Sequence, residues 1–138
     1  EIDYRPVSTD GLIASDKRYD VVLALEIVEH VADVEKFVEH VMSLCKPSGL
    51  VIFSTLNRTP KSFLLGKIAA EYILGWVPKG THDWKKCLKP SELATAIRHT
   101  GGQTMNLEGM AFNPIKGNFE RSARDVDVNY FLSARPAR

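Results

Sequence analysis

Two nearly continuous apolar runs flank a segment in which apolar residues recur every three or four positions. The runs are YDVVLALE (19–26) and LVIFSTLN (50–57), whose length and valine content are typical of strands buried on both faces. Between them, DVEKFVEHVMSLC (33–45) has helical spacing, and Asp33 stands where a helix N-cap is expected. A strand, a helix and a strand joined by short connections predict a βαβ unit with parallel strands.

The remaining segments predict shorter elements around this unit. We expect a weak strand at 1–7, a connection or short helix at 8–18, helices at 60–76 and 91–102, and strands at 103–115 and 125–136. Ser91 is the expected N-cap of the 91–102 helix, and a polar hairpin-like loop joins the last two strands. This order indicates an α/β sheet that ends in an antiparallel pair of strands. Ligands of such sheets bind at the carboxyl ends of the parallel strands.

Composition narrows the class of protein. The 138 residues are enough for one domain with a core, and 44% hydrophobic with 25% charged residues is ordinary for a soluble globular protein. A net charge of +1 argues against a dedicated nucleic-acid binder. Cys45 and Cys87 lie far apart in the sequence and match neither a metal-ligand pair nor a disulfide framework, so a reducing compartment is expected. The longest apolar stretch, 62–78, contains two charges and is too short to cross a bilayer.

The main candidate for chemistry is LEIVEHV (25–31), at the end of the first apolar run. If EIVEH begins a helical turn, Glu26, Glu29 and His30 share one face. Two carboxylates and an imidazole suit Mg²⁺ or another divalent ion, which would ease deprotonation of a bound phenol. Alternatively, His30 alone is a general base, or Glu29 and His30 only cap the turn. Spacing by itself favours capping, because short motifs match by chance.

Three further residues are candidates for a substrate region. Asn57 ends the second apolar run, where polar residues either line a site or cap a helix, and His82 lies in a lysine-rich loop. Tyr72 belongs to the wide apolar surface of the 60–76 helix. Core packing is the favoured role of that surface. The alternative is an interfacial lid that touches a membrane or a lipid tail, with lysines facing anionic headgroups.

The order of these motifs resembles a known superfamily. YDVVLALEIVEHV, followed by LCKPSGLVIFSTLNRT, resembles the class I S-adenosylmethionine-dependent methyltransferases. EHV alone is weakly specific. The longer run STLNRTPKSFLLGKIAAEYILGWVPKGTHDW, together with DVNY, resembles one family within them, the ubiquinone-biosynthesis O-methyltransferases. These enzymes methylate hydroxyls on polyprenylated benzene rings, and the resemblance covers nearly the whole chain.

The resemblance implies roles for individual residues. It implies that Glu26, Glu29 and His30 bind Mg²⁺ or another divalent ion, in place of the capping role that spacing favours. It also implies S-adenosylmethionine as the cofactor. Four residues would contact that cofactor: Leu25 at the end of the strand, and Ser8, Thr9 and Asp10 in the region that holds the adenine.

The resemblance further implies a Rossmann-like methyltransferase sheet that is incomplete at the N-terminus. The family's glycine-rich loop and the acidic residue that holds the ribose should precede Glu1, and the sequence contains neither. We therefore expect residues 1–138 to be the C-terminal portion of a single methyltransferase domain. A sheet without its first strands leaves the remaining ones short of neighbours, so this portion alone is expected to be inactive.

The expected function is S-adenosylmethionine-dependent methylation of a phenolic hydroxyl on a polyprenylated catechol intermediate of ubiquinone biosynthesis. The expected partners are the lipid-like substrate, a membrane surface that contacts 60–76, and a ubiquinone-biosynthesis complex, with no nucleic acid. The expected location is the bacterial cytoplasm, peripheral to the inner membrane, or alternatively the mitochondrial matrix. Two other functions stay open. One is methylation of another small molecule or of an RNA end, and the other is a non-catalytic scaffold subunit.

Overall fold

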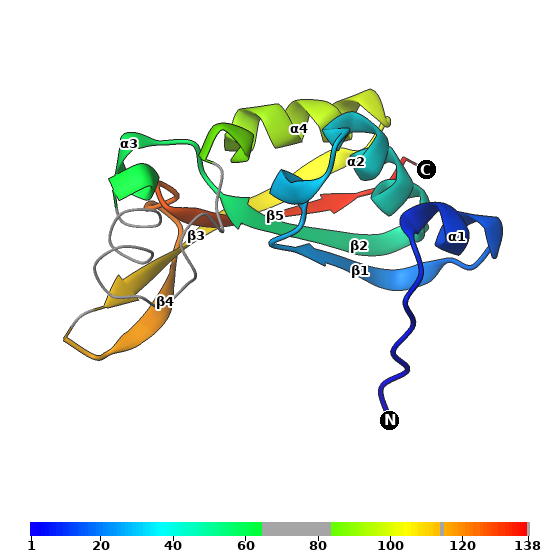
Figure 1. The fold of residues 1–138 in the computed structure, drawn as a ribbon, viewed down its shortest axis with the longest axis horizontal. Coiled ribbons are helices and arrows are strands. Elements are labelled where there is room, and N and C mark those ends of the chain that lie inside the picture. Colours follow the sequence, from blue (N-terminus) through cyan, green and yellow to red (C-terminus); the bar gives the residue numbers. More distant parts are fainter. Residues whose placement is uncertain (65–83, 114, 138) are drawn as a thin grey trace.

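The computed structural model describes residues 1–64, 84–113 and 115–137, which form a five-stranded mixed sheet in the order β1-β2-β5-β3-β4 (Figure 1). The strands are β1 (Tyr19–Leu25), β2 (Cys45–Leu56), β3 (Gln103–Asn113), β4 (Asn118–Ser122) and β5 (Asn129–Arg135). The helices are α1 (Thr9–Ala14), η1 (Val28–His30), α2 (Val34–Ser43), α3 (Pro60–Ser62), η3 (Trp84–Lys86) and α4 (Pro90–His99). No helix in these ranges is long and apolar enough to cross a membrane.

The predicted βαβ unit is confirmed. β1 and β2 pair in parallel, with α2 between them in the chain, and Asp33 caps α2 by accepting a hydrogen bond from the backbone N–H of Lys36. β5 then pairs antiparallel with both β2 and β3, which confirms the predicted antiparallel pair at the C-terminal end. The carboxyl ends of β1 and β2 therefore meet at one edge of the sheet, where LEIVEHV begins.

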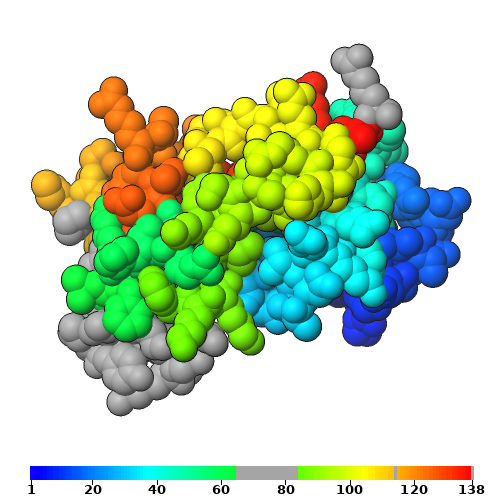
Figure 2. Space-filling model, turned by 90° about the horizontal axis from the view of Figure 1, so that it is seen from above, coloured from blue at the N-terminus to red at the C-terminus, as the bar shows by residue number. Residues whose placement is uncertain are grey.

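The two faces of the sheet differ. α2 and α4 lie side by side over one face, which we call the helix face, and bury the core against β2 and β5 (Figures 1 and 2). Val38, Leu93 and Phe53 are among its fully buried residues. No helix of the described residues covers the opposite side, which we call the open face (Figure 1). Leu23, on that face, is 58% exposed.

Several predicted boundaries are wrong, each for a local reason. Residues 1–7 form no strand, because no described strand pairs with them. β2 begins at Cys45 rather than at residue 50, and its irregular start places six of its residues, Cys45 to Leu50, against Tyr19 to Val21 of β1. The glycine at position 49 fits there because a Cβ would lie 2.6 Å from the carbonyl oxygen of Asp20.

The remaining differences lie in the second half of the chain. Lys89 rather than Ser91 is the N-cap of α4, because Pro90 already occupies the first helical position. α4 ends as expected at a glycine, since Gly101 has a φ of +77°. The loop predicted between the last two strands contains β4, which pairs antiparallel with β3. Only residues 60–64 of the predicted 60–76 helix lie within the described residues.

Candidate active site at the carboxyl ends of the parallel strands

The turn after β1 is not helical where the sequence predicted a helical turn. Glu26 has a φ of +49°, in the left-handed region that costs a non-glycine residue about 1–2 kcal/mol. Its backbone N–H faces both the carbonyl oxygen of Ser54 at 3.0 Å and the hydroxyl of Ser54 at 3.2 Å, which fixes this conformation. η1 starts only at Val28. The condition under which Glu26, Glu29 and His30 would share one face, a helical turn that begins at Glu26, is therefore not met.

The Glu26 carboxylate is held by residues from two other strands. Its Oε1 accepts a hydrogen bond from the hydroxyl of Ser54 at 2.7 Å and another from Nδ2 of Asn129 at 3.0 Å. Ser54 lies near the end of β2, and Asn129 is the first residue of β5. Both of these donors bind Oε1, so within the described part of the chain Oε2 is the oxygen that a ligand could contact.

The Glu29 carboxylate is buried, with the residue only 4% exposed. Its Oε2 accepts a hydrogen bond from the hydroxyl of Thr55 at 2.8 Å, whereas its Oε1 has no hydrogen-bond partner among the described residues. Nε2 of His30 lies 4.0 Å from that oxygen, and the His30 side chain is 51% exposed. Glu29 and His30 therefore form a carboxylate–imidazole pair in which the carboxylate is buried and the imidazole is accessible.

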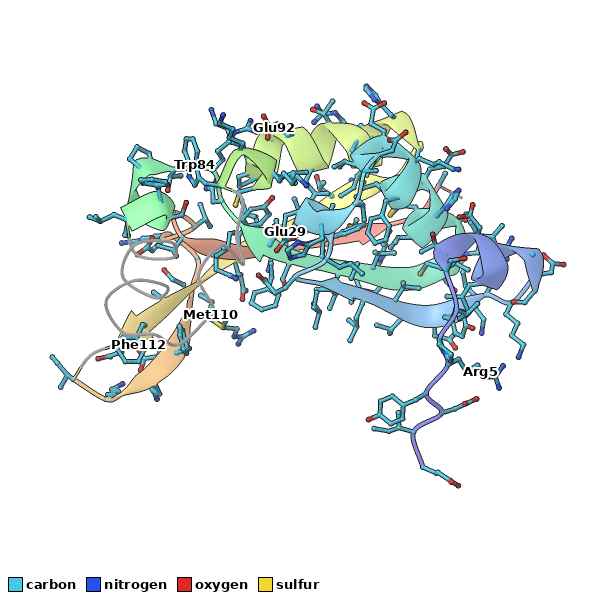
Figure 3. The ribbon with its side chains drawn as sticks, in the orientation of Figure 1. Arg5, Glu29, Trp84, Glu92, Met110 and Phe112 are labelled. Atoms are coloured by element: carbon cyan, nitrogen blue, oxygen red, sulfur yellow. The ribbon has the colours of Figure 1, made fainter. Side chains whose placement is uncertain are left out.

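The two carboxylates lie on opposite faces of the sheet. Ser54 and Thr55 are successive residues of a strand, so their side chains point in opposite directions. Thr55 stands opposite Tyr130, whose hydroxyl donates to the carbonyl oxygen of Leu88, just before α4. Thr55 and Glu29 thus belong to the helix face, where Figure 3 labels Glu29 in η1, and Glu26 belongs to the open face.

This arrangement does not fit the predicted metal ligands. Within residues 1–64, 84–113 and 115–137, no three His, Cys, Asp or Glu side chains are grouped so that they could hold a metal ion. The reason is local, because Ser54 and Thr55 draw Glu26 and Glu29 to different faces. The metal-binding role of Glu26, Glu29 and His30 stays a prediction, and no chemical step is derived from it.

Burial and charge both raise the pKa of Tyr130, which pairs with Thr55 near this edge. Burial is the larger cause that raises the pKa of its hydroxyl well above the ordinary value, and the negative charges of Glu92 and Glu29 raise that pKa further. The hydroxyl therefore keeps its proton and remains a donor to Leu88. This hydrogen bond attaches β5 to the start of α4.

Asn57 joins the end of β2 to the segment that precedes β5. It is buried, its backbone N–H donates to Val128 at 2.8 Å, and its Nδ2 donates to Val126 at 2.9 Å. Its Oδ1, like Oδ1 of Asn129 and Oε1 of Glu29, is buried without a partner among the described residues. Three unsatisfied acceptors at one edge are unusual in a folded protein and mark a place where a donor or cation could bind.

The segment after Asn57 is tied to the same part of the chain. The Thr59 hydroxyl donates to the carbonyl oxygen of Asp127, and the indole of Trp84 donates to the carbonyl oxygen of Thr59 at 3.1 Å. Lys61 donates to both carboxylate oxygens of Asp125, at 2.9 and 2.8 Å, which raises the pKa of Lys61 and lowers that of Asp125. These contacts fix how the chain leaves β2.

The predicted cofactor residues fall into two places. Leu25 is 47% exposed on the open face beside Glu26, so it can offer an apolar contact. Ser8 caps α1, while Thr9 bonds to Nδ1 of His40 at 3.2 Å and Asp10 pairs with α2. In Figure 1, α1 lies at the opposite end of β1 from Glu26. The structure brings Leu25 to the edge but not Ser8, Thr9 and Asp10, and the cofactor-binding role of these four residues stays a prediction.

Two predicted substrate residues, Tyr72 and His82, lie outside the described residues. On the helix face, a pocket of about 750 Å³ opens next to Glu29, between η1, η3 and α4. Arg58 lines this pocket and donates to the Glu92 carboxylate and to the carbonyl oxygen of Lys85 (Figure 3 labels Glu29, Trp84 and Glu92). A second hollow of about 840 Å³, between α2 and α4, contains none of the predicted site residues.

Comparison with known proteins identifies the family. Residues 2–104 match the family described as "Methyltransferase domain". The chain belongs to this methyltransferase family. The chain is also 46% identical over 99% of its length to a ubiquinone biosynthesis O-methyltransferase of Dinoroseobacter shibae, and 47% identical over 99% to that of Azorhizobium caulinodans. It spans about half of these relatives, 56% and 53% of their lengths.

Solved methyltransferase structures share the fold. A structure from Thermotoga maritima, described as a SAM-dependent methyltransferase and possible histamine N-methyltransferase, superimposes with a TM-score of 0.63 at 12% identity. The superimposed region covers 87% of this chain and 57% of the Thermotoga maritima chain. Magnesium protoporphyrin IX methyltransferase from Synechocystis gives a TM-score of 0.53 at 19% identity, over 88% of this chain and 46% of its own. These likenesses confirm the predicted methyltransferase-like α/β fold.

Two residues of this candidate site, Ser54 and Asn129, are not among those that the sequence predicted. A weak signal existed for both. Each is a polar residue next to an apolar run at a strand end, and Asn129 belongs to the DVNY motif. Nothing in the sequence pairs them with Glu26, however, because Asn129 is 103 positions away in the chain.

Proposed function

We propose that the protein to which these residues belong is an S-adenosylmethionine-dependent O-methyltransferase of ubiquinone biosynthesis. Its proposed substrate is a phenolic hydroxyl of a polyprenylated catechol. The observation that carries the proposal is the 46% identity over 99% of the chain to a ubiquinone biosynthesis O-methyltransferase. The location of the polar residues agrees with it, since they lie at the carboxyl edge of the parallel strands, where α/β sheets bind ligands.

The chain's own residues support acid–base work at this edge. S-adenosylmethionine, when bound, supplies an electrophilic methyl group, and the phenol must lose its proton as its oxygen takes that methyl. His30 is the candidate general base, because its side chain is accessible and its Nε2 lies 4.0 Å from the buried Glu29 carboxylate. The Glu29 charge would stabilise the imidazolium that forms when His30 takes the proton. Leu25 would provide an apolar contact for the cofactor.

A divalent ion such as Mg²⁺ is a separate proposal. In its favour, carboxylate oxygens are the ligands that Mg²⁺ prefers, and Oε1 of Glu29 has no partner among the described residues. Against it, Glu26 and Glu29 bond to hydroxyls on opposite faces of β2. A chelator experiment decides between these observations.

The proposed substrate also implies contact with lipid. We propose that residues 60–76 admit the polyprenyl tail and touch a membrane surface, at the inner membrane in a bacterial cytoplasm or in a mitochondrial matrix. Within the described part of this segment, Phe63 and Leu64 are 38% and 57% exposed, which supports an apolar contact surface. Association with other enzymes of ubiquinone biosynthesis belongs to the same proposal.

The experiment uses the full-length protein with labelled S-adenosylmethionine and a short-tailed polyprenyl catechol, with and without a chelator. Methyl transfer to the catechol is the expected result. Loss of transfer on chelation and recovery with Mg²⁺ would support the ion, whereas activity that ignores the chelator would leave His30 as the base without it. No transfer to the catechol, with transfer to a soluble phenol or an RNA end, would overturn the proposed substrate.

The scaffold alternative is tested by calorimetry on the same full-length protein. A methyltransferase binds S-adenosylmethionine with a measurable heat, and a non-catalytic scaffold that has lost its site does not. Membrane contact is tested by flotation with anionic vesicles, comparing Leu64→Asp with Ile115→Asp. Ile115 is 94% exposed on the β3–β4 hairpin, outside the proposed contact segment, and serves as the matched apolar control.

A further inference from the structure

Glu26 combines a costly backbone conformation with a tightly held side chain. Its φ of +49° persists because Ser54 accepts its backbone N–H. The same Ser54 hydroxyl donates to its carboxylate at 2.7 Å. Strained non-glycine residues persist only where their surroundings fix them, and they cluster at functional sites. The strained backbone and the hydrogen bonds together fix the position of the Glu26 carboxylate on the open face.

Asn129 adds the second constraint from a different strand. Its Nδ2 donates to Oε1 of Glu26 at 3.0 Å, while its Oδ1 is buried without a partner among the described residues. The amide orientation is determined by this contact, because exchanging the two groups would set Oδ1 against a carboxylate oxygen. Asn129 therefore leaves one acceptor unsatisfied in order to point its donor at Glu26. That arrangement is costly to stability and is more readily explained by a role for Glu26.

We propose that Asn129 and Ser54 are positioning residues that hold Glu26 so that its Oε2 accepts a hydrogen bond from the catechol hydroxyl adjacent to the one that gives its proton to His30. This inference rests on the proposed function. Both donors bind Oε1, so Oε2 is the oxygen left for the substrate. A carboxylate fixed at two points loses little freedom when the substrate binds, and a displacement of about 1 Å can cost about 100-fold in rate.

The test is a double-mutant cycle in the full-length protein. Asn129→Ala is expected to lower kcat for the phenol about tenfold or more, because the carboxylate then keeps only the hydrogen bond from Ser54 and is less restricted in rotation. The Kd for S-adenosylmethionine should stay within about twofold, and so should the fraction of folded protein. In a Glu26→Gln background the same Asn129→Ala change should cause no further loss, because Asn129 acts only through the carboxylate. Equal losses in the two backgrounds would overturn the inference.

Asn106 provides the matched control. Its Nδ2 also donates to a carboxylate, that of Glu108 at 3.0 Å, but on an exposed part of β3. Asn106→Ala should therefore leave kcat unchanged. Asn129→Asp keeps the shape of Asn129 but removes its donor, so it should lose as much activity as Asn129→Ala. An active Asn129→Asp protein would overturn the role of the hydrogen bond.

A spectroscopic readout separates this inference from the proposed function. In a ¹H–¹⁵N spectrum of the full-length protein, the side-chain amide signals of Asn129 are assigned by their loss in Asn129→Asp. These signals should shift when Glu26 is replaced by alanine, whether or not the protein methylates a phenol. Unchanged signals would show that Asn129 does not hold Glu26 and would overturn the inference. A wild-type protein without transfer to the phenol would overturn the proposed function instead.

Discussion

Glu26 and Glu29 are three residues apart in the sequence, but their carboxylates lie in different environments on opposite faces of the sheet. Glu29 is buried on the helix face, where Thr55 binds one of its oxygens and the core surrounds it. Glu26 lies on the open face, where Ser54 and Asn129 bind one oxygen and leave the other available. The difference arises from one step along β2, because consecutive strand residues point to opposite sides of the sheet.

Two residues of one short motif can therefore lie in two different environments. A carboxylate on the helix face is surrounded by low-dielectric core, so changes to its partners act mainly on stability. A carboxylate on the open face is closer to solvent, so changes to its partners act mainly on its position. Variants on the two faces test this division.

The helix face should dominate folding stability. Phe53→Ala removes a fully buried ring between β2 and the helices and should lower the free energy of unfolding by about 3–5 kcal/mol. Leu23→Ala, on the open face at 58% exposure, should cost less than about 1 kcal/mol. Urea denaturation of the two variants measures both values. Similar losses would contradict the division between the faces.

Removal of the hydroxyl on the helix face of β2 should lower stability more than removal of the neighbouring hydroxyl on the open face. Thr55→Val leaves the buried Glu29 carboxylate without a donor and should cost about 1–3 kcal/mol. Ser54→Ala should cost only about 0.5–1.5 kcal/mol, because Glu26 keeps Asn129 and is less buried. Thermal unfolding of both variants at neutral pH tests the ranking. A larger loss for Ser54→Ala would show that the open face is the better packed one.

Tyr130 should make the folding stability depend on pH in the alkaline range. Burial raises its pKa in the folded protein above the ordinary value of 10.0, so the folded state holds the proton more tightly than the unfolded state does. This contribution is complete below pH 10 and falls as pH rises above it, by roughly 1 kcal/mol for each pH unit. Tyr130→Phe should remove that slope. Melting temperatures between pH 8 and 11 measure it, and parallel curves for the two proteins would contradict the assignment.

The smallest effect is expected at the rim of the helix-face pocket. Arg58 pairs with Glu92, but both side chains are partly exposed, so Arg58→Met should change stability by only about 0–1 kcal/mol. Added salt should reduce the difference between variant and wild type further. Denaturation at low and high salt provides the measurement. A loss above about 2 kcal/mol would mean that Arg58 organises the pocket rather than bordering it.

The sequence predicted the βαβ unit because periodicity and capping are local properties. The apolar runs, the helical spacing and Asp33 each identify an element without knowledge of its neighbours. The strand expected at 1–7 failed for the opposite reason, since a strand exists only where another strand pairs with it. β4 was missed because its sequence, NFERS, is polar and short.

The candidate site was predictable in its location but not in its geometry. Polar residues at the ends of two parallel strands indicate a site edge, and Glu26 and Glu29 were named on that basis. Their orientation depends on a left-handed φ at Glu26 and on contacts with β2 and β5. Spacing along the chain contains neither piece of information, because an i, i+3 relation brings side chains together only in a helix.

The outer edge of β1 has a consequence for handling these 138 residues on their own. Among the described strands β1 pairs only with β2, so its other side presents unpaired backbone groups next to Val21, Leu23 and Leu25, each about half exposed. Such an edge is a template for adding a strand from another molecule. Self-association by strand addition would then rise with protein concentration, and the colloidal behaviour of the sample, rather than its thermal stability, would limit its useful range.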